Sequence, residues 1–227
     1  MTAPILAIDV TGPGGGAALA GDRDIATGLI PPDSARGRDL IPQVKRLLDD
    51  AGLALTDLGG IACAIGPGSF TGIRIGIATA ATLAYAEGLP VLPLGSLHGI
   101  AAAAPAEATH VAVALNARRE HVFAARFTRR DGALEAQGDY EHVPAADFAA
   151  SLPADTCVLG DAREAYEELF ARFPGTADVP VRPDVIARLA RDAFARGEGQ
   201  SADTLRPMYL RLSDPELRRQ QTGPFDV

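Results

Sequence analysis

The sequence predicts an α/β protein made of two related lobes, each a mixed sheet with flanking helices. The first observation is that short apolar runs alternate with longer segments whose apolar residues recur at helical spacing; this alternation is typical of α/β layers. The second is that each half of the chain opens with three strands and continues with helices and one or two further strands. We therefore expect an N-terminal lobe over residues 1–105 and a C-terminal lobe over residues 106–227.

The first half is expected to contain both strands and amphipathic helices. Strands are predicted at residues 5–10, 16–21, 23–30, 61–66 and 91–96, where apolar runs are bounded by turn-forming residues. Helices are predicted at residues 34–51, 71–87 and 96–104. In the first helix, Leu40, Val44 and Leu47 fall on one face at helical spacing, and charged residues cover the other side.

The second half repeats this order of elements. Strands are predicted at residues 110–117, 120–129, 132–141 and 156–160, and helices at residues 144–152, 161–173 and 182–197. The segment from about 203 to 227 is irregular and polar. We expect it either to pack across both lobes or to stay mobile.

Composition excludes several classes of function. No apolar run reaches the roughly 18 residues that a membrane helix needs, and the N-terminus lacks the basic region of a signal peptide, so the expected compartment is the cytoplasm. The formal net charge of −8 argues against a free-standing nucleic-acid binder. Cys63 and Cys157 lie in apolar runs and are expected to be buried free thiols. The four histidines show no metal-ligand spacing, so no metal site is expected.

A glycine-rich loop, "GPGSFTGIRIG" at residues 66–76, separates a predicted strand from a predicted helix. It has no lysine after its last glycines, so it is not a Walker A loop. Its glycine spacing and the lack of an acid after the next strand disfavour a dinucleotide site. The residues that define this motif loop are Gly66, Pro67, Gly68, Ser69, Thr71 and Arg74.

The helix after this loop carries small residues at every fourth position: Gly72, Gly76, Ala80, Ala84 and Gly88. Such a stripe lets another element approach closely, and the remaining faces are mostly apolar, so the helix should be buried on more than one side. Two interpretations stay open. The stripe packs within the chain's own fold, or it lies at a subunit interface in a four-helix contact with the preceding helix. The candidate interface residues are Leu40, Val44, Leu47, Phe70, Gly72, Ile73, Gly76, Ile77, Ala80, Leu83 and Ala84.

The glycine motif, together with "ILAIDVTG" near the start and "MYLR" near the end, resembles the TsaB family. The resemblance runs along essentially the whole chain and includes "NARREHVFAARF". It implies a fold of the actin-like ATPase and sugar-kinase type. It also implies a subunit that does not catalyse transfer itself, but pairs with its paralogue TsaD in forming threonylcarbamoyladenosine in tRNA.

The same resemblance implies further partners. An ATPase, TsaE, joins the complex, and tRNA is reached only through the complex. It implies that the helices near residues 34–51 and 71–87 make the contact with TsaD. No tightly bound cofactor is expected, although the interface leaves room for a nucleotide, and a homodimer is an option when the partner is absent.

The sequence departs from the clan's catalytic pattern at three places. Arg36 stands where related chains carry a histidine near the start of the first helix. Asp9, Thr11 and Gly12 form a vestigial version of the phosphate loop, with glycine and threonine out of place. Asn116 replaces an acid in the second lobe, and an amide cannot act as a general base. Each change weakens an independent catalytic role, and Asp9 is best interpreted as a turn residue.

Two alternatives remain. The chain could be an enzyme acting alone, a kinase of the same clan or a peptidase, using Asp9, Thr11 and Ser69; no Ser-His-Asp arrangement is apparent. It could also bind tRNA directly through arginine groups, although in an acidic chain these are more often salt-bridged. The arginines concerned are Arg118, Arg119, Arg126, Arg129, Arg130, Arg206, Arg211, Arg218 and Arg219.

Overall fold

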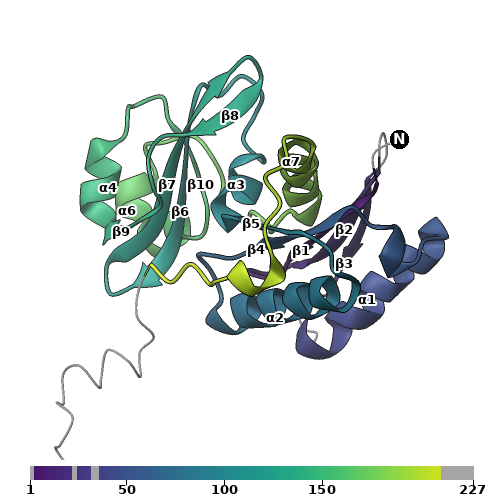
Figure 1. Ribbon diagram of the computed structural model, residues 1–227. Coiled ribbons are helices and arrows are strands. Elements are labelled where there is room, and N and C mark those ends of the chain that lie inside the picture. The colour runs from purple at the N-terminus through teal and green to yellow at the C-terminus, as the bar shows by residue number, and fades with distance from the viewer. Residues whose placement is uncertain (1–2, 22–24, 32–35, 211–227) are drawn as a thin grey trace, which may run out of the picture.

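The computed structural model describes residues 3–21, 25–31 and 36–210, and these form two mixed five-stranded sheets with flanking helices (Figure 1). This is the fold class that the sequence predicts. No helix among the described residues is long and apolar enough to cross a membrane.

The first sheet has the strand order β3-β2-β1-β4-β5. Its strands are β1 (Ile5–Asp9), β2 (Gly16–Ala20), β3 (Ile25–Leu29), β4 (Gly60–Ala64) and β5 (Val91–Leu94). The first three strands form an antiparallel meander, and β4 and β5 add to β1 in parallel. Strands β1, β2 and β4 are buried on both faces, which explains why their sequences are continuous apolar runs.

Helices cover both faces of this sheet (Figure 1). Helices α1 (Arg36–Ala51) and α2 (Phe70–Glu87) lie on one face, and α7 (Pro183–Ala195) lies on the other. Along β1, side chains alternate between the two faces: Leu6 and Ile8 belong to the core beneath α1 and α2, whereas Ile5 and Ala7 pack with α7. A short 3₁₀ turn, η1 (Leu55–Asp57), follows α1.

The second sheet has the order β10-β6-β7-β8, with β9 also paired to β7. Its strands are β6 (His110–Arg118), β7 (His121–Arg130), β8 (Ala133–Ala136), β9 (Glu141–Pro144) and β10 (Cys157–Leu159). One face packs against α3 (Ser96–Ala101). The other packs against α4 (Ala145–Ser151), α5 (Ala162–Ala165) and α6 (Glu167–Phe170).

Two helices pack on the sheet of the other half of the chain. Helix α3, expected in the N-terminal lobe, contributes Leu97 and Ile100 to the core of the second sheet. Helix α7, expected in the C-terminal lobe, contributes Ile186 and Ala190 to the core of the first. The division at residue 105 therefore does not follow the packing of these two helices, and the chain crosses between the lobes before each of them.

Two predicted elements of the second half are interrupted in the structure. The strand expected at residues 132–141 is two strands, β8 and β9, which pair with successive stretches of β7. The turn between them includes Gly138, whose φ of 82° suits glycine. The helix expected at residues 161–173 breaks at Tyr166 (φ −138°, ψ 55°), where the side-chain hydroxyl donates to Asn116 Oδ1.

The C-terminal segment returns to the first lobe. Gln200 forms an antiparallel bridge with Val91, the 3₁₀ turn η2 (Ala202–Thr204) follows, and Leu205 is buried in the core beneath α1 and α2. The described part of the expected tail, residues 203–210, thus packs on the first lobe. The remainder of the tail, residues 211–227, lies outside the described residues.

Candidate functional site

The glycine loop turns the chain between β4 and α2 and is held by the chain's own backbone. Ser69 N donates to Thr11 O at 2.6 Å, and Ser69 Oγ accepts from Gly72 N at 3.2 Å, which makes Ser69 the N-cap of α2. At Gly68, with φ of 156°, a Cβ would come within 2.5 Å of Thr11 O. Glycine is therefore needed here for contact with the neighbouring β1–β2 turn.

The stripe of small residues on α2 faces the chain's own sheet. Gly72, Gly76, Ala80 and Ala84 are buried, and a Cβ at Gly76 would contact Val10, Cys63 and Ile8 at 3.3–3.7 Å. The fifth member of the stripe, Gly88, is instead the exposed C-cap, with φ of 64°. The buried part of the stripe therefore packs within the chain's own fold and does not face outward.

Most other candidate interface residues are covered in the same way. Leu40, Val44 and Leu47 of α1 belong to the core of the first sheet, and Ile73 is 2% exposed. Leu40, Leu47 and Ile73 are therefore not available to a partner unless the chain opens, whereas Val44 also lines a surface groove. Of the remaining candidates, Phe70 is 37% exposed, and Ile77 and Leu83 are half-buried. Thr71 and Arg74 of the motif loop are also exposed.

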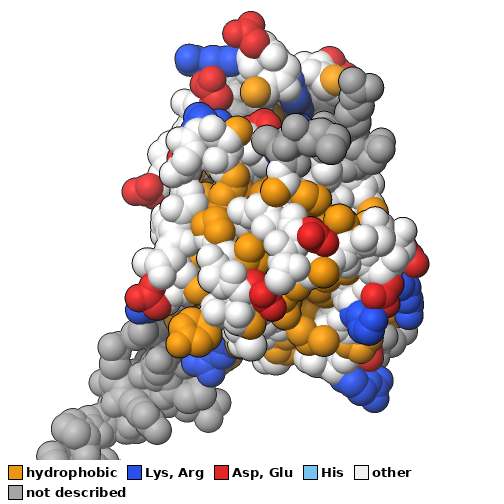
Figure 2. Space-filling model, turned by 45° about the vertical axis from the view of Figure 1, so that its right-hand side comes forward, with side chains coloured by type: hydrophobic (Ala, Val, Ile, Leu, Met, Phe, Trp, Pro, Cys, Tyr) orange, Lys and Arg blue, Asp and Glu red, His pale blue; other side chains and the backbone are white. Residues whose placement is uncertain are grey.

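The outer side of the helix pair nevertheless presents apolar surface. A groove of about 280 Å³ lies between α1 and α2. It is lined by Ile41, Val44, Lys45, Leu48, Asp49, Leu53, Ala54, Leu55 and Leu83. Figure 2 shows hydrophobic side chains gathered on the side of the molecule where these helices lie.

A second exposed feature runs along α2, on the side of the helix away from its buried stripe. Phe70, Arg74, Ala78, Thr82 and Tyr85 are exposed and recur at intervals of three or four residues, so they form one strip on the helix surface. Tyr85 is 85% exposed. We call these five residues the outer strip of α2. Small residues occupy its middle and aromatic residues its two ends.

The acid of the vestigial phosphate loop is enclosed by the chain itself. Asp9 is fully buried; its Oδ1 accepts from Thr11 N at 3.0 Å and from Thr11 Oγ1 at 2.7 Å. Burial raises the pKa of Asp9 to about 6. A Cβ at Gly12 would lie 2.8 Å from Val181 Cγ1, so the glycine accommodates the crossing segment before α7. Asp9 is thus placed as a turn residue, and no cluster of three or more metal-ligand side chains occurs among the described residues.

A cleft of about 1,140 Å³ separates the lobes. The first lobe lines it with Thr11, Gly12, Ser69 and Phe70, and the second lobe with Leu115, Asn116, Arg118 and Asp161; the crossing segment 177–181 and residues 208–210 also contribute.

On the second-lobe side of the cleft, hydrogen bonds of Asn116 stabilise the β6–β7 hairpin. Its Oδ1 accepts from Arg118 N at 2.8 Å and from Tyr166 Oη at 3.1 Å, while Asn116 N donates to Asp161 Oδ1 at 2.7 Å. These bonds hold a hairpin in which Arg118, Arg119 and Glu120 all have φ between 52° and 65°. The position that the family pattern gives to an acid therefore has a structural use here.

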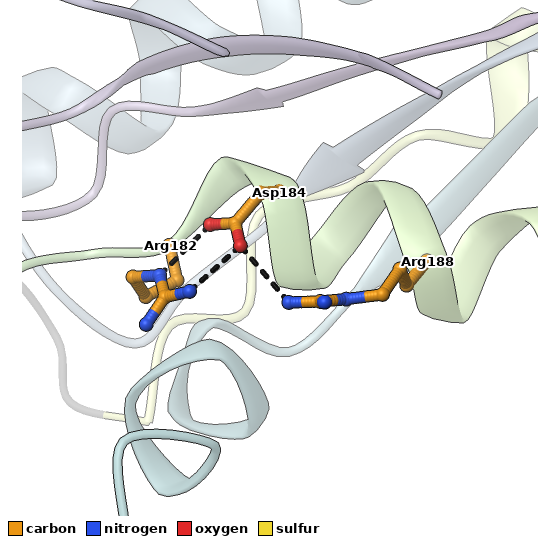
Figure 3. Close-up of polar contacts among 3 residues, drawn as sticks. All are labelled: Arg182, Asp184 and Arg188. Carbon is orange, nitrogen blue, oxygen red and sulfur yellow. Dashed lines mark hydrogen bonds and ion pairs between the residues drawn. The ribbon is translucent and has the colours of Figure 1, made fainter. Parts of the chain in front are cut away.

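The segment that crosses from the second lobe to α7 is fixed by an ion-pair cluster (Figure 3). Arg182 binds both oxygens of Asp184, with Nε–Oδ1 and Nη2–Oδ2 distances of 2.8 and 2.7 Å. Arg188 Nη2 donates to Oδ2 of the same carboxylate at 2.9 Å. Asp184 also lies in the first turn of α7, where the helix dipole favours a negative charge.

Most of the described arginines considered for tRNA contact already have partners. Arg126 pairs with Glu141 at 2.6 Å, Arg130 pairs with Glu135 at 3.7 Å, and Arg129 and Arg206 donate to backbone carbonyls. Arg211, Arg218 and Arg219 lie outside the described residues, as does the side chain of Arg36.

Three exposed residues on the α1–α2 side of the molecule were not predicted from the sequence as candidate site residues: Ile41, Tyr85 and Tyr209. Ile41 is 47% exposed, although its neighbour Leu40 is fully buried. Tyr85 could have been found from its spacing of fifteen positions after Phe70, which places both on one side of the helix. Tyr209 reaches α2 only through tertiary packing, and no local sequence pattern predicts this contact.

Comparison with known proteins assigns the chain to a family. A family model described as TsaD, tRNA N6-adenosine threonylcarbamoyltransferase, matches residues 23–164. The tRNA threonylcarbamoyladenosine biosynthesis protein TsaB of Bacillus subtilis is 30% identical over 184 residues, which cover 78% of this chain and 80% of that protein. The protein of the same name from Escherichia coli is 29% identical over 183 residues, covering 76% of this chain and 79% of its own.

Solved structures agree. The structure of YeaZ from Pseudomonas aeruginosa superimposes with a TM-score of 0.82 and 30% sequence identity, covering 92% of this chain and all of that one. The two mixed sheets with flanking helices are thus an actin-like ATPase type of fold. The chain belongs to the TsaD family of tRNA threonylcarbamoyltransferase domains and, within it, to the TsaB group.

Proposed function

We propose that this chain is a non-catalytic subunit that pairs with a TsaD-type paralogue. The pair supports threonylcarbamoyl transfer to the adenosine next to the anticodon of tRNA. The observation that carries the proposal is the apolar outer face of the α1–α2 pair, with its groove and the 85% exposed Tyr85. Exposed apolar surface of this kind marks a protein interface more often than a solvated face.

The kind of partner follows from the family. The matched region, residues 23–164, includes both helices, so a paralogue of the same fold brings an equivalent pair. Two such pairs can pack ridges into grooves as a four-helix contact. In this arrangement the buried stripe of α2 seats the helix on its sheet, and the outer strip meets the partner. TsaE and tRNA join through the complex, which works in the cytoplasm.

The buried geometry of Asp9 supports a non-catalytic role. Its carboxylate is turned onto Thr11, and the crossing segment packs on Gly12, where the clan's phosphate loop would need open backbone. We propose no tightly bound cofactor; a nucleotide, where the complex uses one, binds at the interface with the partner. Without the partner, the same apolar face is available to a second copy of the chain.

A reconstituted reaction tests the proposal. Threonylcarbamoylation of tRNA is measured with the cognate TsaD, TsaE and the adenylate-forming enzyme, with and without this chain. We expect the reaction to require the chain, to survive Asp9→Asn and to be lost with Ala78→Arg, which places a charge in the middle of the outer strip. Arg196→Ala, at the exposed C-terminal end of α7, is the control. A reaction that proceeds equally well without the chain contradicts the proposal.

The same preparation tests the alternative of an enzyme acting alone, a kinase or peptidase of the actin-like clan. The isolated chain would then turn over nucleotide or peptide, and Asp9→Asn would abolish that turnover. The closed geometry around Asp9 leads us to expect no such activity after stringent purification.

A further inference from the structure

The C-terminal segment 205–210, which we call the strap, is fastened to the glycine loop and to the start of α2. Leu205 is 4% exposed in the core of the first sheet, and Met208 N donates to Ile65 O at 2.8 Å. A Cβ at Gly66 would come within 3.0 Å of Met208 O. The strap therefore follows the surface of the motif loop closely and delivers Tyr209 to the first turn of α2.

There, Tyr209, Phe70 and Arg74 form one stacked cluster. The rings of Phe70 and Tyr209 are 5.1 Å apart and nearly parallel, at 25°. The guanidinium carbon of Arg74 lies 3.8 Å from the centre of the Phe70 ring, and Arg74 Nε donates to Tyr209 Oη at 2.9 Å. The contact with the Phe70 ring and the hydrogen bond to Tyr209 thus hold the guanidinium of the exposed Arg74 in one position.

Within the described part of the chain, no carboxylate lies within ion-pair distance of Arg74, although several other arginines are paired. A guanidinium has five N–H donors, and Tyr209 uses one of them. Arg74 therefore presents a fixed and largely unused fork of donors. This geometry matches a carboxylate, which can accept two parallel hydrogen bonds.

We propose that the cluster of Phe70, Arg74 and Tyr209 is the second anchor of the partner-binding face, and that Arg74 pairs there with a carboxylate of the TsaD-type partner. The inference rests on the proposed function. It is supported by continuity, because Phe70 and Arg74 belong to the outer strip whose other end is Tyr85. Fifteen helical residues span about 22 Å, and the small Ala78 and Thr82 between the ends leave room for a helix of the partner.

The strap then acts as a positioning element. Tyr209 fixes the side chains of Phe70 and Arg74 before the partner binds. The conformational entropy of these two side chains is therefore not lost on binding, which favours the complex. Arginine and tyrosine are also the residue types that carry most binding energy at interfaces. RNA is the less favoured occupant, since one arginine at this site, on a chain of net charge −8, gives little attraction for phosphates.

Titration calorimetry with the purified cognate partner tests the proposal. We expect Arg74→Ala and Arg74→Lys each to weaken binding about tenfold or more, because lysine lacks the planar fork. Tyr209→Ala should weaken it by a similar factor, and Tyr209→Phe by less, since the stacked ring remains. The double variant with Arg74→Ala and Tyr209→Ala should weaken binding by less than the product of the two single-variant factors, because both side chains act through one contact. Arg130→Ala is the matched control and should bind as the wild type does.

Ala78→Arg, in the same titration, separates this inference from the proposed function. If Ala78→Arg abolishes binding while Arg74→Ala and Tyr209→Ala bind normally, the anchor is overturned and the proposed partner stands. If all three bind normally, both fail. If Arg74→Ala weakens only the binding of tRNA to the assembled complex, the carboxylate partner is overturned. Arg74 and Ala78 are exposed, so these two variants should fold and keep the test decisive even if Tyr209→Ala loosens the strap.

Discussion

The carbonyl oxygen of Val10, the residue that follows β1, occupies the space in which a side chain at Gly72 would begin. Helix α2 therefore starts in direct contact with the backbone of the central strand, and Ser69 N binds the Thr11 carbonyl next to it. The glycines of the motif are required because helix and strand approach too closely for a Cβ atom. This contact explains the glycine-rich stretch without any bound phosphate.

Gly72→Ala should therefore destabilise the protein far more than Gly76→Ala. A Cβ at position 72 overlaps a carbonyl that cannot move without shifting β1, and such overpacking costs about 2–3 kcal/mol. At position 76 the closest atom is Val10 Cγ2 at 3.3 Å, and alanine gains about 1 kcal/mol in helix propensity, so the net change should be small. Urea unfolding of both variants measures the difference. Equal midpoints would show that the contact at position 72 is easily relieved.

Arginine substitutions at two neighbouring positions of α2 should have opposite effects on folding. Ala80 is fully buried against the sheet, so Ala80→Arg buries an unpaired charge and should unfold the chain, at a cost of several kcal/mol. Ala78 is exposed, so Ala78→Arg should change the free energy of unfolding by less than about 0.5 kcal/mol. Circular dichroism during thermal unfolding distinguishes the two. A folded Ala80→Arg variant would show that α2 can separate from the sheet.

The sequence allowed the fold class and most elements to be predicted, because periodicity reports which residues are buried. Strands β1, β2 and β4 of the first sheet are continuous apolar runs, and the helix at 36–51 has its apolar residues on one face. What periodicity could not reveal is the element against which a face packs. The stripe from Gly72 to Ala84 fits a partner helix and a sheet equally well, and only the position of Val10 and Cys63 decides between them.

The assignment of helices to lobes could not be predicted for a related reason. Helix α7 follows the second-lobe elements in sequence, yet its apolar face, with Ile186 and Ala190, is covered by β1 and β2. Crossing connections of this kind leave no local signal. In the candidate site, the motif loop was found from its glycines, whereas the contact of Tyr209 with Phe70 joins residues 139 positions apart and depends wholly on tertiary packing.

Asp184→Asn should lower stability at neutral pH more than Arg188→Ala does. The hydrogen bonds and charge of Arg182, with a smaller contribution from Arg188, hold the pKa of Asp184 below its usual value. The stability gained is present above the ordinary carboxyl pKa and is lost as pH falls through the lower pKa of the folded state. We expect a loss of about 1–2 kcal/mol for Asp184→Asn at pH 7. Arg188 makes one contact from an exposed position, so its loss should cost below about 0.5 kcal/mol.

Urea unfolding at pH 7 and at pH 3 checks this prediction. The difference between the wild type and Asp184→Asn should shrink at the lower pH, because the unfolded chain then binds a proton at this carboxyl group that the folded ion pair disfavours. A difference that persists unchanged at pH 3 would mean that Asp184 stabilises the start of α7 without its charge. An equal loss for Arg188→Ala would mean that the pairing with Arg182 is not the dominant contact.

Asp9 should give the opposite pH dependence. Its folded-state pKa of about 6 lies above the ordinary 3.8, since burial outweighs the two hydrogen bonds from Thr11. The stability associated with the protonated carboxyl is therefore fully present below pH 3.8 and is lost as pH rises through 6. Relative to the wild type, the free energy of unfolding of Asp9→Asn should increase by about 2 kcal/mol between pH 4 and pH 7, because asparagine carries no charge to bury.

The pKa of the neighbouring thiol of Cys63 is raised by burial and by Asp9, so this thiol stays neutral throughout. Asp155, Asp184 and Glu198 titrate in both proteins and cancel in the comparison. A constant difference between the two proteins across this range would mean that the Asp9 carboxyl is already ionised at pH 4, and that water or a counter-charge reaches the end of β1.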